Sequence, residues 1–262
     1  MNIAQMVAKY EDRGFTRERA ELNALMENAA FTIFREFPDS FVLFGGATLV
    51  LYHNSVRHSA DLDLLPRAPA PPSPEEIVAT LQRDLSPIAR ILQFDDLAFD
   101  IQSSGDREGR ISVTANAGQR LFQIDITRFG YAIESEIENH LTEGESGLSA
   151  VIRSPTRELL LLHKAEAFLL RRSVKARDAY DIYLLRELGA ELNPNLRAHL
   201  HDTVLANELD SDTISDRISR VDRTLCRLEL KPILPPAVYA PLEAVNFEPL
   251  REDLRNLYRE WL

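Results

Sequence analysis

A short apolar stretch that ends in two glycines constrains this chain most, because it defines one compact α/β unit. The sequence FVLFGG (41–46) predicts a buried strand that stops at Gly45-Gly46, where the missing side chains let the backbone turn and approach a ligand. ATLVLYHN (47–54) then reads as a short helix, and RHSADLDL (57–64) alternates polar and apolar residues as a strand does. A plain turn is the commoner role of a Gly-Gly pair, so the glycines gain meaning only from their neighbours.

The second strand of this unit carries two carboxylates on one face. Side chains two positions apart in a strand point the same way, about 7 Å apart along the backbone. Asp61 and Asp63 therefore share a face with Arg57 and Ser59, while the alternate leucines face the core. Two carboxylates this close repel each other unless water or a cation lies between them. The pattern favours a metal site or an exposed edge.

An Asp-x-Asp pair alone is weak evidence, because a chain of this length is expected to contain about one by chance. Asp210 and Asp212 form a second such pair in the polar stretch NELDSDTISD. We interpret that pair as part of a solvated loop or a helix cap. Only the first pair follows a glycine turn within an α/β unit.

The rest of the sequence predicts an α+β fold, with a mixed sheet in the N-terminal part and a largely helical C-terminal half. Alternating runs between residues 97 and 129 predict strands, and the last run places Leu121, Gln123, Asp125 and Thr127 on one face. The stretch 134–147 reads as a mobile acidic connector. We expect one domain over 1–150 and a second over 151–262. Helices are expected at 16–37 with Thr16 as N-cap, at about 75–92, at 154–172 with Ser154 as N-cap, at 175–188 ending at Gly189, and within 195–262.

Composition excludes several classes of protein. No run of 18 apolar residues predicts a membrane span, and the N-terminus lacks the apolar core of a signal peptide. The single cysteine, Cys226, cannot form an intramolecular disulfide or a cysteine-based zinc cluster, which favours a cytoplasmic location. A net charge of −11 argues against a general nucleic-acid coat protein. Residues 151–177 depart from this balance, with seven basic and two acidic residues, and so indicate a confined anion site.

The predicted helix at 154–172 places three cations within an apolar stripe. Arg157, Lys164 and Arg171 recur every seven residues and therefore lie on one helical face. One interpretation is that their aliphatic stems pack while the charged tips stay in water. For Arg157 and Arg171 it is as good as the interpretation that they bind an anion, but for Lys164 it is the poorer of the two. We expect this face to turn toward the Asp61/Asp63 strand, with Lys164 adding little to stability.

The next helix, KARDAYDIYLL, carries two carboxylates of its own. Asp178 and Asp181 are three residues apart and can share a face. Arg177 lies four residues before Asp181, so an ion pair within the helix would account for that pair alone. That ion pair would not explain why the helix carries a second carboxylate, Asp178, on the same face.

Taken together, these groups suit metal-assisted phosphoryl or nucleotidyl transfer. One or two Mg²⁺ ions take hard oxygen ligands and bridge phosphate oxygens, while Lys and Arg offset charge on the triphosphate. A carboxylate can also orient or deprotonate an attacking hydroxyl. Asp125 is a third candidate carboxylate if its strand lies beside the first; otherwise it faces solvent on a sheet with one wet side.

At these residues the chain resembles the AbiEii/AbiGii toxin family of nucleotidyltransferases, in the DNA polymerase β-like superfamily. FGGATLVLYHNSVRHSADLDL is similar to the first motif of that family, LLLLHKAEAF to its lysine motif and RDAYDIYLL to its Arg-Asp-x-x-Asp motif, in the same order. The resemblance covers most of the first 190 residues and implies a nucleotidyltransferase core completed by the helical domain. It implies roles in phosphate binding for Gly45, Gly46, Arg57, Ser59 and Lys164, in metal binding for Asp61, Asp63 and Asp125, and in catalysis for Asp61, Asp63, Lys164 and Asp178.

The resemblance also implies substrates and partners. Family members include toxins paired with a neighbouring antitoxin that add nucleotides to tRNA 3′ ends, so NTP, Mg²⁺, a tRNA acceptor and an antitoxin protein are expected. Two alternatives stay open: transfer of the nucleotide to a small molecule or protein, and a non-catalytic regulatory module of the same fold. The low net charge favours the first alternative, and the intact Asp61, Asp63, Lys164 and Asp178 argue against the second.

Overall fold

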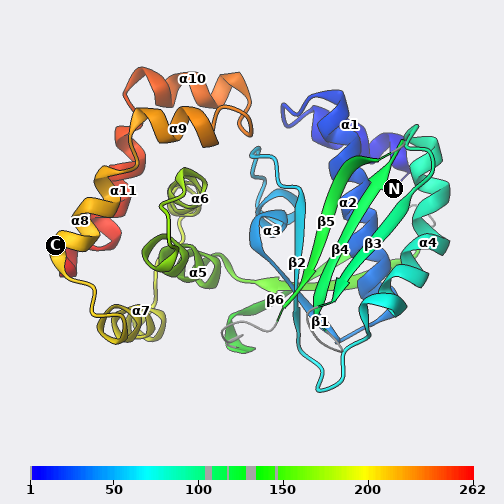
Figure 1. Cartoon of the computed structure of the whole chain (residues 1–262), viewed down its shortest axis with the longest axis horizontal. Coiled ribbons are helices and arrows are strands. Elements are labelled where there is room, and N and C mark those ends of the chain that lie inside the picture. The colour runs from blue at the N-terminus through cyan, green and yellow to red at the C-terminus, as the bar shows by residue number, and fades with distance from the viewer. Residues whose placement is uncertain (1, 104–107, 117, 128–133, 145–146) are drawn as a thin grey trace. The chain divides into compact units, whose positions relative to one another are not determined.

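The chain forms two compact units, Met1–Pro155 and Thr156–Leu262 (Figure 1). The computed structural model describes residues 2–103, 108–116, 118–127, 134–144 and 147–262, and it confirms the α+β fold. All strands of these ranges belong to the first unit, and the second is helical. Within the same ranges, no helix has the length and hydropathy needed to cross a lipid bilayer.

A five-stranded mixed sheet forms the centre of the first unit (Figure 1). Its strand order is β1-β2-β5-β4-β3, in which β2 and β5 run parallel and the other neighbours are antiparallel. β2 therefore lies inside the sheet, with a hydrogen-bonded neighbour on each side. Residues 128 and 129 of the expected strand region lie outside the described residues. The strands are β1 (Phe41–Phe44), β2 (Asp61–Pro66), β3 (Ala98–Ser103), β4 (Gly109–Ala115) and β5 (Gln119–Ile126).

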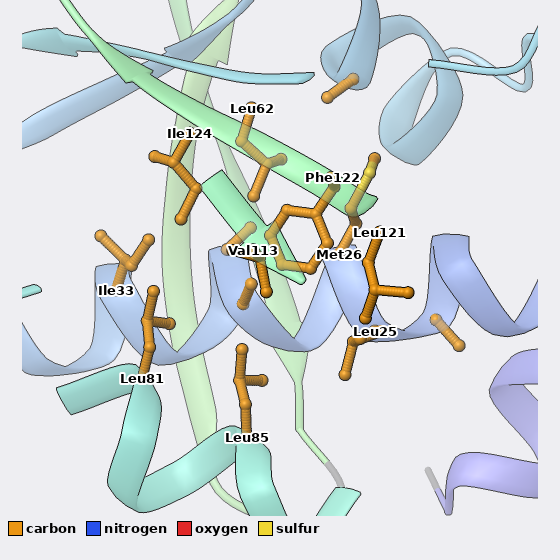
Figure 2. Packing of buried hydrophobic residues seen from close by; sticks show 14 of the residues in the cluster. Leu25, Met26, Ile33, Leu62, Leu81, Leu85, Val113, Leu121, Phe122 and Ile124 are labelled. Carbon is orange, nitrogen blue, oxygen red and sulfur yellow. The ribbon is translucent and has the colours of Figure 1, made fainter. Parts of the chain in front are cut away.

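The hydrophobic core of this unit lies between the sheet and two helices, α2 (Arg17–Glu36) and α4 (Pro74–Ile91). Figure 2 shows the side chains of both helices pointing toward apolar side chains of β2, β4 and β5. Complete burial of one such side chain contributes about 1.5–3 kcal/mol. The labelled members are Leu25, Met26, Ile33, Leu62, Leu81, Leu85, Val113, Leu121, Phe122 and Ile124.

Helices α2 and α4 begin within about one residue of the predicted positions, whereas α3 (Gly45–Tyr52) begins at the glycines and not after them. Thr16 is the N-cap of α2, and Ser73 caps α4 by accepting a hydrogen bond from the Glu76 N–H (3.3 Å). The Glu76 carboxylate accepts in return from the Ser73 N–H (2.7 Å), which completes a capping box. The expected short helix after the glycines is α3 (Gly45–Tyr52).

An additional helix, α1 (Ile3–Glu11), packs on α2 through a buried carboxylate. Lys9 Nζ lies 2.9 Å from Glu27 Oε1, and the Tyr10 hydroxyl donates to Glu27 Oε2 (2.8 Å). Burial, and then the nearby Glu27 carboxylate, raise the pKa of Tyr10 well above its usual value. The hydroxyl therefore keeps its proton at neutral pH and remains a donor to Glu27.

The stretch expected to be an acidic connector is instead structured. Residues 134–143 form η1 (Glu134–Glu136) and β6 (Ile137–Glu143), which pairs antiparallel with β7 (Ser149–Pro155). Tyr52 of α3 stacks on His140 with ring centroids 3.9 Å apart, and its hydroxyl lies 3.2 Å from Thr142 Oγ1. The side of β6 that packs inward is thus polar and hydrogen-bonded, so the apolar alternation that signals a strand is absent from this sequence. Residues 145 and 146 lie outside the described residues.

The second unit begins with α5 (Arg157–Leu170), whose N-cap differs from the predicted one. Ser154 and Pro155 finish β7, and Thr156 caps the helix by accepting from the Leu159 N–H (3.3 Å). The next helix, α6 (Ala176–Glu187), is followed by Gly189 at φ +83°, as expected for a glycine at a helix C-terminus. The remaining helices are α7 (Pro194–Ala206), α8 (Ser211–Ser219), α9 (Arg223–Glu229), α10 (Pro236–Ala244), α11 (Glu248–Leu257) and η2 (Arg259–Trp261).

Two residues of the second unit bear on the sequence analysis. Asp210 is the N-cap of α8 and accepts a hydrogen bond from the Thr213 N–H (2.8 Å), which confirms the helix-cap interpretation of that Asp-x-Asp pair. The pKa of Asp210 is lowered mainly by its hydrogen bonds with Thr213. Cys226 of α9 is buried, and burial raises the pKa of its thiol to about 12.

We predict that Phe122→Ala lowers the free energy of unfolding by about 3–5 kcal/mol, because the ring is fully buried between β5 and the helices. Leu141→Ala is the control, since that side chain is 75% exposed on β6 of the same unit and should change stability by less than about 0.5 kcal/mol. Urea unfolding followed by circular dichroism measures both. Equal effects of the two variants would contradict the assignment of this core.

Candidate active site

Strand β2 presents the two predicted carboxylates on the face opposite the core. Leu62 and Leu64 are fully buried, whereas the Asp61 side chain is 41% exposed. The alternation confirms the predicted strand, but the strand begins at Asp61 and not at Arg57. Residues 53–60 form a loop after α3, so Arg57 and Ser59 reach the carboxylates from a loop and not from the same strand.

The Gly45-Gly46 turn lies directly against these side chains. A Cβ on Gly45 would overlap the Asp63 carboxylate, at 2.8 Å from its Cγ, and Gly45 has φ +77°, which other residues rarely adopt. A Cβ on Gly46 would lie 2.5 Å from Arg57 Nη2 and 2.7 Å from Ser59 Oγ. The glycines therefore make room for an acid, a cation and a hydroxyl at the first turn of α3.

This first turn is suited to an anion. The first N–H groups of a helix have no partner within the helix, and the helix dipole adds a partial positive charge there. Arg57 is almost completely buried beside the turn, and its Nη1 donates to the His58 carbonyl (3.1 Å). Burial and the neighbouring cations Arg19 and Arg57 lower the pKa of His58 to about 4, so that His58 is neutral at pH 7.

Asp125 lies beside Asp63, as its predicted strand position suggested. The two residues are partners in the parallel β2–β5 register. Both oxygens of Asp125 already accept hydrogen bonds: Oδ1 from Arg110 Nε (2.7 Å), and Oδ2 from Arg110 Nη2 (3.3 Å) and Gln123 Nε2 (2.7 Å). The hydrogen bonds to Asp125 raise the pKa of Arg110.

Sequence reasoning missed two arginines that flank these carboxylates. Arg110 lies opposite Asp125 on β4, and Arg120 Nη2 lies 4.0 Å from Asp61 Oδ1. Strict alternation on β5 places Arg120 on the other face. A register shift opposite Val113 and Thr114 adds one residue to β5, which turns Arg120 to the carboxylate face.

The same register shift corrects the expected position of Leu121. Leu121 and Phe122 are consecutive, yet both are buried in the core (Figure 2). Leu121 therefore does not share the face of Gln123 and Asp125. One pattern in the sequence could have revealed Arg110. On β4, Arg110, Ser112 and Thr114 alternate with apolar residues, which places Arg110 on the polar face of the sheet.

A second group of charges lies between α5 and α6 in the other unit. Lys164 Nζ is 2.8 Å from Asp181 Oδ2 and 3.6 Å from Asp178 Oδ1, and Arg171 Nε is 3.0 Å from Asp178 Oδ2. The Asp178 and Asp181 side chains are fully buried, and the Lys164 side chain is 12% exposed. Two cations thus neutralise two buried carboxylates.

These contacts decide between the interpretations of the two helices. Lys164 does not place its tip in water, because its ammonium group joins α5 to α6. These contacts argue against the expectation that Lys164 adds little to stability, because a buried carboxylate that loses a cation is costly. Asp181 pairs with Lys164 across helices and so has a role beyond an ion pair within α6. Arg157 behaves as a surface residue, with Nη1 donating to the Leu188 carbonyl (3.1 Å).

A buried tyrosine completes the surroundings of this group. The Tyr258 hydroxyl donates to the Ala165 carbonyl (2.9 Å), one residue after Lys164. Burial, and then the Asp178 charge, raise the pKa of Tyr258 well above its usual value.

Among the described residues, no group of three or more His, Cys, Asp or Glu side chains is arranged to hold a metal ion by itself.

Comparison with solved structures finds three similar proteins, of which the first shares the fold of this chain. A protein from H. pylori named as a candidate nucleotidyltransferase has a TM-score of 0.56 and 18% identity over 94% of this chain and 97% of its own. JHP933 from Helicobacter pylori has a TM-score of 0.49 and 16% identity, over 94% of each chain. An antigenic nucleotidyltransferase-like protein from Paracoccidioides brasiliensis has a TM-score of 0.45 and 14% identity, over 75% of this chain and 91% of its own.

Comparison with protein families gives a more specific result. None of the curated proteins compared with this chain matches it. The family described as "Nucleotidyl transferase AbiEii toxin, Type IV TA system" matches residues 30–261, a range that includes the glycine turn, both carboxylates of β2 and the charges between α5 and α6. The chain therefore belongs to the AbiEii family of nucleotidyltransferase toxins of type IV toxin–antitoxin systems.

Proposed function

We propose that this nucleotidyltransferase uses Mg²⁺ and an NTP to add a nucleotide to the 3′ end of a tRNA. The observation that carries the proposal is the convergence of Asp63, Arg57 and Ser59 on the Gly45-Gly46 turn at the start of α3. That turn combines an anion-binding helix end with a cation, a hydroxyl and a carboxylate. The tRNA acceptor and a neighbouring antitoxin partner are proposed from the family.

The carboxylates of β2 fit Mg²⁺ in the way that nucleotide enzymes bind it. Mg²⁺ is commonly held by one or two carboxylates, with substrate phosphates and water as the other ligands. We assign Asp61 and Asp63 as the two protein ligands. Asp125 is the third candidate ligand. One of the Asp125 oxygens would have to lose its hydrogen bond from Arg110 before that oxygen could bind the metal. Bound Mg²⁺ would offset charge on the phosphate oxygens.

The remaining residues of the first unit would hold and orient the triphosphate. Arg57 and Ser59 lie at the first turn of α3, where they can donate hydrogen bonds to phosphate oxygens beside the N–H groups of that turn. Arg120 lies near Asp61 and is exposed, so it can contact the outer phosphates. A hydroxyl of the acceptor attacks the α-phosphorus, the bond to the β-phosphate breaks, and pyrophosphate leaves. The proton of that hydroxyl passes to a carboxylate of this group.

The helical unit would complete the site through Lys164. We propose that the Lys164 ammonium group contacts the triphosphate during transfer and offsets its negative charge. Asp178 and Asp181 would then hold Lys164 in place until the triphosphate binds. Asp178 also orients Arg171.

The acceptor is tested by incubating the protein with each labelled NTP, in Mg²⁺ or EDTA, with and without tRNA. Label on tRNA in Mg²⁺, and none on tRNA whose 3′ hydroxyls have been oxidised with periodate, supports the proposal. Label on the protein or on a small molecule favours another acceptor, and no transfer of any NTP contradicts the proposal. A small DNA-binding protein encoded next to this chain would support the antitoxin partner.

We expect Asp61→Asn or Asp63→Asn to reduce nucleotide transfer by at least about 100-fold, because each substitution removes an anionic ligand of the metal. The fold should be retained, since each change also relieves repulsion between two carboxylates. Asp210→Asn is the matched control: asparagine caps a helix as well as aspartate does, and the α8 cap is remote in sequence and role. Transfer near the wild-type rate in either β2 variant would refute the metal assignment.

We expect Lys164→Met to abolish transfer and also to lower the free energy of unfolding by about 3–5 kcal/mol, because the buried Asp181 and Asp178 carboxylates lose the ammonium group that lies 2.8 Å and 3.6 Å from them. Lys164→Met/Asp181→Asn removes one positive and one negative charge together, and should regain most of the stability while remaining inactive. Thermal unfolding and transfer assays on both variants separate the effects. A stable and active double variant would show that Lys164 only neutralises the aspartates.

A further inference from the structure

The loop that carries Arg57 and Ser59 is tied to the N-terminal helix by one arginine. Arg13, just after α1, donates from Nη2 to the Val50 carbonyl (2.8 Å) and to the Ser55 carbonyl (2.6 Å). Val50 belongs to the last turn of α3, and Ser55 belongs to the loop that leads to β2. One nitrogen thus joins the end of α3 to the start of this loop.

Arg13 stabilises the loop because it lies at the C-terminal end of α3. The last carbonyls of a helix have no partner within the helix, and the helix dipole makes that end negative, so a cation is stabilising. Asn54 has φ +55°, which ends the helical path after α3 and leaves these carbonyls to other donors. Arg13 supplies the donor and the charge together.

The guanidinium group is also fixed by aromatic rings. Its central carbon lies 5.1 Å from the centroid of Tyr10 and 5.6 Å from that of Phe15, both of which are buried. In the described part of the chain, Arg13 Nε and Nη1 have no hydrogen-bond acceptor, so Nη2 makes all of the polar contacts that hold the loop. Because of its burial the pKa of Arg13 is lowered, yet an arginine keeps its charge at neutral pH.

The contacts continue from Arg13 to the candidate phosphate site. The Arg57 N–H donates to Ser55 Oγ (3.2 Å), and the Ser55 N–H donates to the Leu49 carbonyl (2.9 Å). Ser55 is fully buried. Its carbonyl is therefore held by Arg13 while its hydroxyl holds the backbone of Arg57, whose side chain lies over Gly46.

We propose that Arg13 is a positioning residue that sets the loop 53–60, and through it Arg57 and Ser59, for binding the triphosphate. Arg13 lies before the range 30–261 that matches the family, so this role is argued from its contacts alone. The effect on nucleotide binding rests on the function proposed above. The effect on the loop itself does not.

The test compares substitutions on the same N-terminal segment. Arg13→Met keeps the packing against Tyr10 and Phe15 but removes both hydrogen bonds and the charge. Arg13→Lys retains one nitrogen that can reach both carbonyls. Lys9→Met is the matched control, because Lys9 stabilises the same helix through Glu27 and makes no contact with the loop that the structure records.

Arg13→Met should speed hydrogen exchange of the amides of 53–60 and raise the KM for NTP about tenfold, with a smaller change in kcat. Arg13→Lys should restore part of both. Lys9→Met should lower the melting temperature while leaving loop exchange and KM unchanged.

Two outcomes overturn the inference: loop exchange equal in Arg13→Met and wild type, or faster exchange with an unchanged KM in an active enzyme. If the wild-type protein neither binds nor transfers NTP, the proposed function fails, and the exchange of 53–60 in Arg13→Met then decides the positioning role by itself.

Discussion

The register of β2 in the sheet is the constraint on which the first unit depends. Leu62 and Leu64 are fully buried, so a slip of one residue would place the neighbouring carboxylates in the apolar core. Burying two unpaired carboxylates costs several kcal/mol each, which is comparable with a typical domain's whole stability of about 5–15 kcal/mol. Because β1 pairs Phe44 with Asp63, the same register sets the glycine turn that follows Phe44 against the Asp63 carboxylate. Packing of two leucines thus determines where the acids of the site lie.

Local patterns in the sequence predict the parts of this site that depend on local rules. Alternation gives the faces of β2, and the paired glycines mark the close approach of α3, because both follow from backbone geometry alone. Arg57 and Ser59 were expected on the strand, yet they reach the site from a loop whose path is set by Arg13 and Ser55. Arg120 reaches it because of one additional residue in β5, and a two-residue period cannot represent such a shift. Strand β6 was missed for a related reason, since its inward side chains His140 and Thr142 are held by ring stacking and a hydrogen bond and not by apolar contact.

The charges between α5 and α6 show the same limit in a helical unit. Helical periodicity correctly groups Lys164 with apolar residues, but the partner of a buried cation is a tertiary property. In the structure, Lys164 and Arg171 neutralise Asp178 and Asp181, and the desolvation of the two carboxylates is offset only while both cations stay beside them. Such a set contributes little net stability compared with apolar packing. It does fix the angular position of α5 relative to α6, since rotation of either helix would separate the charges.

Cys226 gives the chain a practical property. Its thiol is buried and has a pKa of about 12, so at neutral pH almost none of it is the reactive thiolate. As the chain contains no other cysteine, a thiol introduced at an exposed position would react with maleimide reagents far faster than the native one. Probes can therefore be attached at single chosen sites without first removing Cys226 from the fold. The side chain that is chemically silent in the native protein thus leaves the rest of the surface open to selective labelling.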